Sequence, residues 1–363
     1  MKRVNNPYFY IMLLSVAGLV GIFTIRTMDM SRTETREGVA MDTLVKLSIT
    51  GSKSRAELSS ILDEAFASLV SLEKKLSMYN PNSQLSRINQ SAGRTAESID
   101  GALFDLLSHS LELAALTDRA FDPTIGAVTA LWKSHREGTA ASTPTLPSAE
   151  EIRSAAAHVN ADALKLDPPN EAFLGRRGMM LDLGAVGKGY ASRVLRDLLG
   201  SHGVSSALID LGGNIVAAGC RPDGSAWRIG VQDPQKPRGT PLLSLEICSA
   251  AVVTSGIYER RWEIEGKTYT HIFDPRTGLP VEGDLQSVTV VTQDPVEGDA
   301  LATAFMVMGA ARSLDLLRVI PGVDAIFVSV AADGAGTVVA TGGLKGSLRL
   351  LSDAYRLVYH DVL

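Results

Sequence analysis

The sequence predicts an α+β fold with a largely antiparallel sheet. From Ala207 onward the chain consists mostly of short apolar segments that are separated by turn sequences rich in Gly, Pro, Asn and Asp. Segments with helical spacing are grouped and do not alternate strictly with these strands. Strict alternation is typical of parallel sheets built from βαβ units, so the grouping favours the α+β class.

The first part of the folded body contains one predicted strand and two predicted helices. Val39–Thr50 alternates apolar and polar residues, which is typical of a half-buried strand. Ser54–Tyr79 has apolar residues at the spacing of one helix face, and Gly101–Thr117 forms a second helix. Glu137–Ser148 is small, polar and Pro-containing, which indicates a surface loop before a short capped helix.

The second part contains most of the predicted strands and one further helix. This helix spans Gly298–Arg318, with Leu301 and Phe305 among its core positions. The predicted strands are Ala207–Asp210, Trp227–Val231, Leu242–Cys248, Tyr269–Phe273, Leu285–Thr292, Ala325–Val330 and Thr337–Ala340.

Charge and cysteine content exclude two classes of function. The formal net charge of −5 gives no basic surface for nucleic acid, so an anionic ligand needs a local site or a metal. The two cysteines, Cys220 and Cys248, form no CxxC motif and no Cys/His cluster, which argues against a structural zinc. They could pair as a disulfide or remain two isolated buried thiols.

The N-terminus has the composition of a membrane segment. Lys2 and Arg3 precede an apolar run that ends at Ile25 and approaches the roughly 20 residues needed to span a bilayer. The segment lacks a lipobox cysteine and a convincing cleavage site, which favours an uncleaved anchor over a removed signal peptide. The sequence thus predicts an anchor at residues 1–25, a linker at 26–38 and one folded domain at 39–363. The basic residues before the run predict an inner-membrane protein whose domain lies on the periplasmic, extracytoplasmic side.

A glycine-rich stretch, Leu181–Ala191, is the first candidate for a ligand site. Its sequence, LDLGAVGKGYA, places three glycines within six positions before a helical pattern. Free N–H groups and the helix dipole favour an anion at such a terminus, and Lys188 adds a positive charge. The spacing matches neither the P-loop nor the dinucleotide fingerprint, so an ordinary turn before a helix is the alternative.

Asp299 and Thr303 form the second candidate, because they lie one helical turn apart at a predicted helix start. A carboxylate, a hydroxyl and a loop carbonyl make an all-oxygen set that suits Mg²⁺. Taken singly, Asp299 could instead be a first-turn acid and Thr303 a hydroxyl that bonds back to the helix. His271 could likewise be an ordinary core or turn histidine, and Asp122 a turn or capping residue.

Eight motifs together resemble one family, the ApbE-type FAD-dependent protein flavin transferases. They occur in the family's order over roughly Val39 to Thr341 as LSMYNPNSQLSRIN, AFDPTIGAVTALW, LDLGAVGKGYA, IDLGGN, WRIGVQDP, TSGIYERR, THIFDPRTG and DALATAFMVMG. The resemblance implies an ApbE-like (T-fold-like) α+β structure whose two lobes enclose FAD in a cleft.

The resemblance also implies roles for particular residues. It assigns Mg²⁺ to the Ala185 carbonyl, Asp299 and Thr303. It assigns an acid/base or phosphate-contact role to His271, with Asp299 contributing to catalysis through the metal. The residues that would line the FAD pocket are Met41, Tyr79, Ala120, Phe121, Asp122, Asp182, Lys188, His271 and Ile272. The implied reaction is phosphoryl transfer, in which a Thr or Ser hydroxyl of an acceptor flavoprotein takes FMN and AMP leaves.

The chain departs from the family pattern at three points. Asp42 stands where a glycine commonly follows the methionine, Thr270 stands where many members have a second histidine, and no N-terminal cysteine is present. Two other functions stay open: hydrolysis of FAD to FMN and AMP, and membrane-tethered FAD binding without catalysis. The expected compartment favours extracytoplasmic domains of membrane redox complexes as acceptors.

Overall fold

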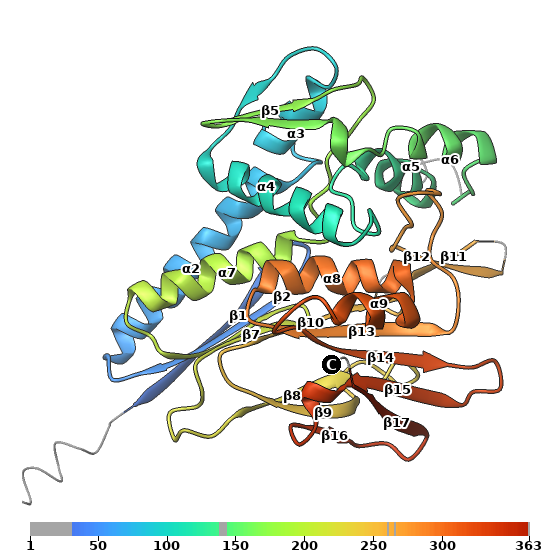
Figure 1. The fold of residues 1–363 in the computed structure, drawn as a ribbon. Coiled ribbons are helices and arrows are strands. Elements are labelled where there is room, and N and C mark those ends of the chain that lie inside the picture. The colour runs from blue at the N-terminus through green and yellow to red at the C-terminus, as the bar shows by residue number, and fades with distance from the viewer. Residues whose placement is uncertain (1–30, 138–143, 260, 265, 362–363) are drawn as a thin grey trace, which may run out of the picture.

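A computed structural model describes residues 31–137, 144–259, 261–264 and 266–361, and it has the predicted α+β class (Figure 1). The helices are α2 (Arg55–Leu76), α3 (Gln84–Gln90), α4 (Gly101–Leu116), α5 (Gly126–Glu137), α6 (Ala149–Ala156), α7 (Gly187–Ser201), α8 (Pro295–Met308) and α9 (Ala310–Leu317). The strands are β1 (Arg32–Ala40), β2 (Thr43–Gly51), β3 (Glu97–Ser98), β4 (Leu164–Asp167), β5 (Glu171–Leu174), β6 (Ser206–Leu211), β7 (Asn214–Ala218), β8 (Trp227–Gln232), β9 (Pro241–Ile247), β10 (Ala251–Gly256), β11 (Arg261–Ile264), β12 (Lys267–Thr270), β13 (Leu285–Thr292), β14 (Asp324–Val330), β15 (Gly336–Thr341), β16 (Leu348–Leu350) and β17 (Tyr355–His360).

A nine-stranded sheet forms the centre of the molecule, in the order β1-β2-β6-β7-β10-β13-β14-β15-β17. Its neighbouring strands are antiparallel except for β15 and β17, which pair in parallel. The expectation of a largely antiparallel sheet is therefore confirmed. The chain between β15 and β17 contains the short helix η2 (Gly342–Leu344) and β16, which gives β17 room to return in the same direction as β15.

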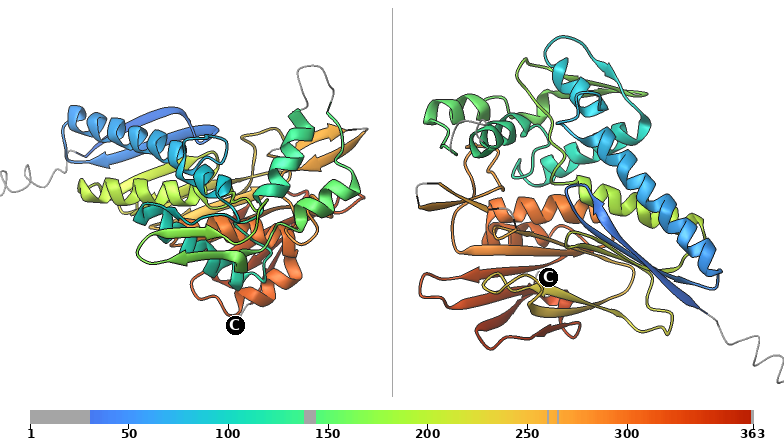
Figure 2. Two further views of the ribbon diagram at one scale, coloured as in Figure 1. Left: turned by 90° about the horizontal axis from the view of Figure 1, so that it is seen from above. Right: turned by 180° about the vertical axis from the view of Figure 1, so that it is seen from behind.

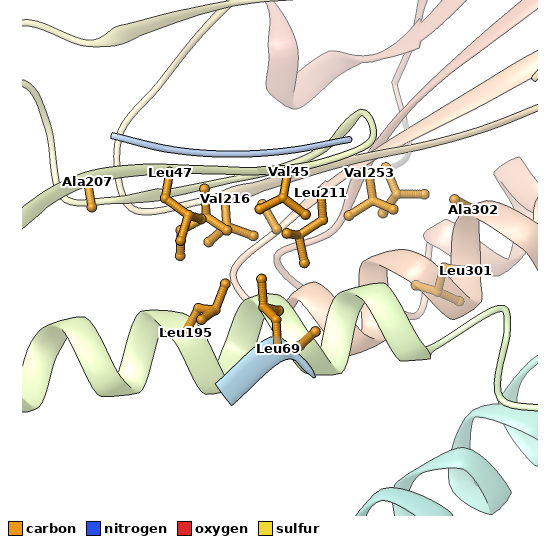
Figure 3. Packing of buried hydrophobic residues seen from close by; sticks show 14 of the residues in the cluster. Val45, Leu47, Leu69, Leu195, Ala207, Leu211, Val216, Val253, Leu301 and Ala302 are labelled. Atoms are coloured by element: carbon orange, nitrogen blue, oxygen red, sulfur yellow. The ribbon is translucent and has the colours of Figure 1, made fainter. Parts of the chain in front are cut away.

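Helices cover one face of this sheet and a small sheet covers part of the other. Leu69 of α2, Leu195 of α7 and Leu301 of α8 pack against strand residues such as Val45 and Val253 (Figure 3). On the opposite face, β8, β9 and β16 form a three-stranded sheet with its own buried cluster of apolar side chains. The central sheet thus has an apolar layer on both faces.

A second lobe, which contains α3 to α6 and the small sheet β3-β5-β4, lies beyond the helices (Figures 1 and 2). Helix α8 joins the two lobes. Its Leu301 and Phe305 belong to the core of the central sheet, whereas Val296, Ala300 and Ala304 belong to the core of the second lobe. A helix that is apolar on nearly all sides is expected at such an internal position.

The predicted linker at residues 26–38 is wrong from Arg32 onward, because β1 occupies Arg32–Ala40. This strand pairs with β2 along its whole length, from Arg32 opposite Gly51 to Ala40 opposite Thr43. It is an edge strand, and many of its side chains are exposed. Its charged composition therefore resembles a linker, although charges are common on edge strands. The single strand predicted at Val39–Thr50 is the turn of this hairpin followed by β2.

Two other predicted elements need correction. The helix predicted at Gly298–Arg318 is two helices, α8 and α9, because Gly309 between them has a φ of +76°. Such a left-handed residue ends an α-helix. The strand predicted at Tyr269–Phe273 is β12, which ends at Thr270. His271 and Ile272 follow it in a bend that leads into the DPRTG turn.

The predicted membrane location is also corrected. None of the described helices is long and apolar enough to cross a membrane. The anchor expected at residues 1–25 lies outside the described residues. Because the inner-membrane location depended on a spanning helix, and the described part of the chain contains none, we withdraw that location.

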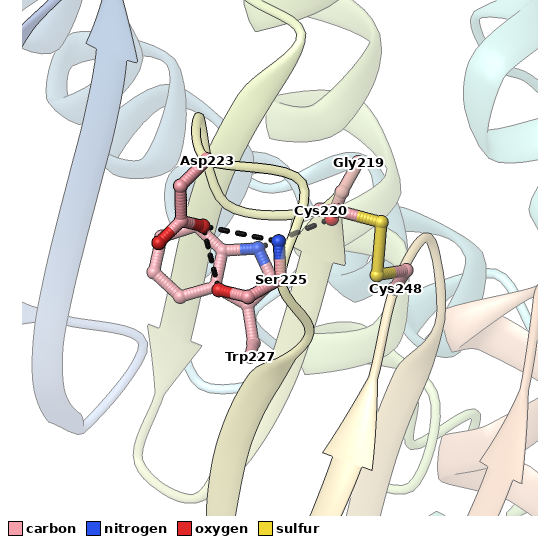
Figure 4. Close-up of a disulfide and its surroundings, with 6 residues drawn as sticks. All are labelled: Gly219, Cys220, Asp223, Ser225, Trp227 and Cys248. Carbon is pink, nitrogen blue, oxygen red and sulfur yellow. Dashed lines mark hydrogen bonds between the residues drawn. A yellow bond between two sulfur atoms is a disulfide. The ribbon is translucent and has the colours of Figure 1, made fainter.

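The two cysteines are paired, which decides between the alternatives left open by the sequence. Cys220 follows β7 and Cys248 follows β9, and their disulfide joins α-carbons 4.6 Å apart (Figure 4). Beside it, Trp227 Nε1 donates a hydrogen bond to the Gly219 carbonyl at 3.1 Å. The disulfide and this bond tie the β8-β9 sheet to the end of β7 in the central sheet.

Candidate active site at the junction of two helix N-termini

Helices α7 and α8 meet closely near their N-termini, and Gly189 makes this possible. A β-carbon at Gly189 would lie 2.1 Å from the Pro295 carbonyl oxygen and 2.9 Å from Asp299 Cβ. These distances are far inside van der Waals contact, so a side chain at this position would force the helices apart. The close approach requires glycine at this position of the LDLGAVGKGYA stretch.

Asp299 lies at this junction and is almost completely buried, with an exposed fraction of 2%. Its Oδ2 accepts a hydrogen bond from the Gly189 N–H at 2.9 Å, and its Oδ1 accepts one from Asn214 Nδ2 at 2.8 Å. Within the described part of the chain, no basic side chain forms an ion pair with it. A buried carboxylate is costly unless a charge or a metal compensates it, so this environment fits a cation ligand.

Thr303 lies one turn further along α8, as the sequence predicts. Its hydroxyl donates to the Asp299 carbonyl oxygen at 3.2 Å, which is the ordinary helix back-bond considered above. The same hydroxyl oxygen is 3.3 Å from Ser255 Oγ at the end of β10. The predicted pair therefore occupies one helix face, and Ser255 adds a second hydroxyl beside it.

The Ala185 carbonyl lies just before α7, in the turn that starts this helix. Gly189 is the residue whose N–H would bond back to this carbonyl in a longer helix, but that N–H bonds Asp299 instead. Gly187 N–H bonds the Leu183 carbonyl at 2.7 Å. Two of the first N–H groups of α7 thus have partners inside the protein, and the helix terminus offers less to an anion than the sequence indicates.

The oxygen atoms at this junction fit a hard divalent cation such as Mg²⁺. The described residues contain no cluster of three His, Cys, Asp or Glu side chains that could hold a metal. A site here would combine one carboxylate with a hydroxyl and a carbonyl. Mg²⁺ keeps several waters and uses only one or two protein carboxylates, so this donor set suits it.

Met41, Tyr79 and Asp182 lie around the entrance to α7. Met41 occupies the β1–β2 turn with a φ of +56°, and its N–H bonds Glu73 at 3.1 Å. Its Cε is 3.7 Å from where a β-carbon of Gly187 would be. Asp42, the departure from the family pattern, has a similar φ of +55°. Asx residues tolerate this conformation better than most, which explains how a non-glycine residue fits.

Tyr79 is half-exposed, and the Lys133 ammonium lies 3.3 Å from the centre of its ring. Partial burial, together with the negative charges of Asp182, Glu137 and Asp42, raises the pKa of the Tyr79 phenol to about 12. Because these charges affect the Tyr79 pKa, Asp182, Glu137 and Asp42 lie near the Tyr79 phenol. An anionic ligand bound beside these carboxylates would need a cation or a basic side chain next to it.

The Ala120–Asp122 turn is buried and is linked directly to the glycine-rich stretch. Asp122 accepts bonds from the Thr124 N–H at 2.8 Å, the Thr124 hydroxyl at 2.6 Å and the Ala161 N–H at 3.1 Å. This is the turn-forming role that the sequence offers as the simpler interpretation. Burial raises the pKa of Asp122. Asp182 N–H bonds the Pro123 carbonyl at 2.9 Å, so this turn positions the residues before α7.

His271 and Ile272 lie in the bend after β12, with His271 half-buried and Ile272 packed into the main core. Ile272 N–H bonds the Thr270 hydroxyl at 3.0 Å, and its carbonyl accepts from Val281 N–H at 2.9 Å. Thr270, which replaces the second histidine of many relatives, therefore holds this bend. The acid/base role of His271 stays a prediction.

Two surface hollows lie away from the helix junction. One of about 550 Å³ is between α5 and α6, next to His158 and Met180. The other, of about 280 Å³, lies beside the β1–β2 hairpin and the Gly212–Gly213 turn. Asp299 and Thr303 line neither hollow, so the FAD cleft stays a prediction.

A comparison with known families decides the relationship. The sequence profile of the ApbE family matches residues 41–327. The chain belongs to the ApbE family. It is 35% identical over 306 residues to the FAD:protein FMN transferase of Treponema pallidum, covering 82% of this chain and 84% of that one. It is 36% identical over 273 residues to the Klebsiella pneumoniae FAD:protein FMN transferase, covering 74% and 83%.

Solved structures of ApbE proteins have the same fold. The apo form of the Pseudomonas stutzeri flavinyl transferase ApbE matches with a TM-score of 0.76 at 30% identity, over 88% of this chain and 98% of that one. The ApbE protein of Thermotoga maritima matches with a TM-score of 0.75 at 28% identity, over 84% and 96%. The fold predicted from the motif resemblance is thus confirmed.

Sequence reasoning missed Asn214 as a site residue and assigned no specific role to Ser255. Asn214 contacts Asp299 across 85 residues of sequence, and Gly189 contacts it across 110. The available signal was the IDLGGN motif, in which a polar residue follows two glycines. Nothing in the motif itself says which residue its side chain meets.

Proposed function

We propose that this chain is a Mg²⁺-dependent FAD:protein FMN transferase. Its curated relatives have the name FAD:protein FMN transferase, and this family membership supports the activity here. The observation that carries the metal assignment is Asp299, a buried carboxylate without an ion pair in the described structure. It lies beside the Thr303 hydroxyl and the turn that contains the Ala185 carbonyl.

The proposed reaction forms one phosphodiester bond and breaks one pyrophosphate bond. The hydroxyl oxygen of a Thr or Ser in an acceptor protein attacks the phosphorus on the FMN side of FAD. The bond to the AMP phosphate breaks and AMP leaves with the electron pair, while the hydroxyl proton passes to a base. A bound Mg²⁺ would supply neutralisation of the charge that develops on the phosphate oxygens.

The residues of this chain would bind the cation, position FAD and contact or protonate the reacting groups. Asp299, Thr303 and the Ala185 carbonyl hold the cation, and the Gly189 N–H keeps the Asp299 carboxylate at the helix junction. The FAD pocket would be lined by Met41, Tyr79, Asp182, Lys188 and the Ala120–Asp122 turn. His271 is the candidate for moving a proton or contacting phosphate.

The experiment incubates the full chain with FAD, Mg²⁺ and an acceptor protein that one of the curated relatives modifies. We expect an FMN adduct on a Thr or Ser by mass spectrometry, with one AMP released per adduct, and no adduct in EDTA. Release of AMP and FMN without an adduct would instead identify an FAD hydrolase. Bound FAD without any product would identify a binding protein.

A further inference from the structure

Asn214 begins β7 directly after a turn of two glycines, and this turn fixes its position. Gly212 and Gly213 have φ values of +63° and +94°. Gly212 N–H bonds the Leu44 carbonyl at 2.9 Å, and Gly213 N–H bonds Asp210 Oδ1 at 2.8 Å. A β-carbon at Gly212 would collide with the Thr43 side chain at 1.8 Å, so the turn is closely packed against β2.

The Asn214 side chain is buried with an exposed fraction of 1%, and one end of its amide has a partner. Its Nδ2 donates to Asp299 Oδ1 at 2.8 Å. An ionised carboxylate can only accept hydrogen bonds, so this contact determines which end of the amide is nitrogen. The other end, Oδ1, is therefore an acceptor, and no donor of the described residues reaches it.

A buried acceptor without a donor is unfavourable and uncommon in folded proteins. Asn214 has this atom next to the one buried carboxylate that we assign to a cation, and an amide oxygen is an ordinary ligand for a hard cation. Two buried serine hydroxyls, of Ser192 and Ser206, also have no partner in the described structure. Among the described residues, neither hydroxyl forms a hydrogen bond with a buried carboxylate.

We propose that Asn214 is a further member of the cation site. Its amide nitrogen holds the Asp299 carboxylate in place, and its Oδ1 supplies an additional oxygen to the coordination shell of the cation. This inference rests on the proposed function, because it requires that Asp299 binds a cation. It adds a residue from the central sheet to a site otherwise built from α7 and α8.

The test measures cation affinity directly and does not depend on turnover. Mn²⁺ takes the same oxygen ligands as Mg²⁺, and its free form is counted by electron paramagnetic resonance while the full chain is titrated. We expect Asn214→Leu, which keeps the branched shape of the side chain but removes both polar atoms, to weaken Mn²⁺ binding at least about tenfold. Asn214→Asp, which keeps an oxygen at this position, should lose less affinity than Asn214→Leu.

Ser206→Ala is the matched control, because Ser206 lies at the other end of the β6–β7 hairpin and also has an unpartnered buried oxygen. It should leave Mn²⁺ affinity within about twofold. Circular dichroism checks that each variant is folded, and Asn214→Ala replaces the Leu variant if that one is not. Unchanged affinity in a folded Leu or Ala variant, or equal losses in the Leu and Asp variants, would overturn the proposal.

Asp299→Ala separates this inference from the proposed function. If Asp299→Ala leaves Mn²⁺ binding unchanged, the cation site itself is wrong and the assignment of Asn214 fails with it. If Asp299→Ala abolishes binding while Asn214→Leu does not alter it, the cation site stands and only the role of Asn214 is wrong.

Discussion

Asp299 and Asp233 are both buried carboxylates, with exposed fractions of 2% and 3%, but their surroundings are built differently. Asp233 Oδ1 accepts bonds from the Gln235 N–H and the Tyr355 hydroxyl, both at 2.9 Å. The Gln235 side chain in turn donates to the same hydroxyl at 2.9 Å. Every member of this group therefore has a partner within the group, and the group closes the turn after β8.

The group around Asp299 remains incomplete. Its two donors come from α7 and β7, and one of them, Asn214, has a buried oxygen without a donor. A closed network stabilises a local turn, whereas an incomplete one assembled from distant segments indicates a place for a ligand. Burial alone therefore does not mark a site; the unfilled acceptor and the distant origin of the donors do.

The largest expected effect is a difference in the rate of FMN transfer between variants of Asp299 and of Asp233. Asp299→Asn removes the negative charge at the cation site and should lower the rate of FMN transfer about 10³-fold, equivalent to about 4 kcal/mol. Asp233→Asn keeps an oxygen for Tyr355 and should leave the rate within a few-fold. Initial rates with FAD, Mg²⁺ and an acceptor give both values. Similar losses in the two variants would contradict the assignment of separate roles.

The second prediction concerns the Cys220–Cys248 disulfide, which holds the β8-β9 sheet, next to Asp233, to the central sheet. Cys220 and Cys248 are 28 residues apart, and closing a loop of this length contributes about 3–4 kcal/mol to the free energy of unfolding. The double variant Cys220→Ser, Cys248→Ser should lose this stability in urea unfolding while its Mn²⁺ affinity is unchanged. Reductant should destabilise the native chain and have no effect on the double variant. A large loss of Mn²⁺ affinity would show that the two regions are coupled.

The third prediction concerns Gly189, where α7 contacts α8 beside Asp299. Gly189→Ala places a methyl group against the Pro295 carbonyl and should destabilise the protein by about 1–3 kcal/mol. It should also weaken Mn²⁺ binding, because the N–H that holds Asp299 moves with the helix. The matched control is Gly200→Ala in the same helix, where a β-carbon meets nothing within 4 Å. That variant should gain up to about 1 kcal/mol from helix propensity.

The smallest expected effect concerns two tyrosines, one in each region. Burial, then the hydrogen bond to Asp233, raises the pKa of Tyr355 to about 12, against an opposing bond from Gln235. Burial and nearby carboxylates raise the pKa of Tyr79 to about 12 as well. A raised pKa favours the folded state while the phenol is protonated. The contribution of each tyrosine to stability is therefore complete below about pH 10 and is lost as the pH rises towards 12.

Ultraviolet difference absorbance of the phenolates, with Tyr355→Phe and Tyr79→Phe to assign them, measures both pKa values. The loss of stability should be larger for Tyr355, because Tyr79 is half-exposed and solvent screens its charges. FAD should raise the pKa of Tyr79 further and leave that of Tyr355 unchanged, since a bound pyrophosphate adds negative charge only near Tyr79. An FAD-dependent change at Tyr355 would contradict the separation of the two regions.

Features that depend on local spacing and on the order of motifs along the chain could be predicted from the sequence. The strand predicted at Leu285–Thr292 is β13 to the residue, because an apolar segment bounded by turns has few other structures available. Asp299 and Thr303 occupy one helix face because they are one turn apart. The order of the motifs also predicted the family, and members of one family share a fold.

Features that depend on contacts between distant segments could not be predicted from the sequence. β1 forms a strand because β2 pairs with it, although its own composition resembles a linker. Gly189 is required because of the Pro295 carbonyl, and Asn214 meets Asp299 only because β7 contacts α7, which packs against α8. The periodicity of a segment describes its own faces, whereas the partner that each face meets is set by how distant segments pack.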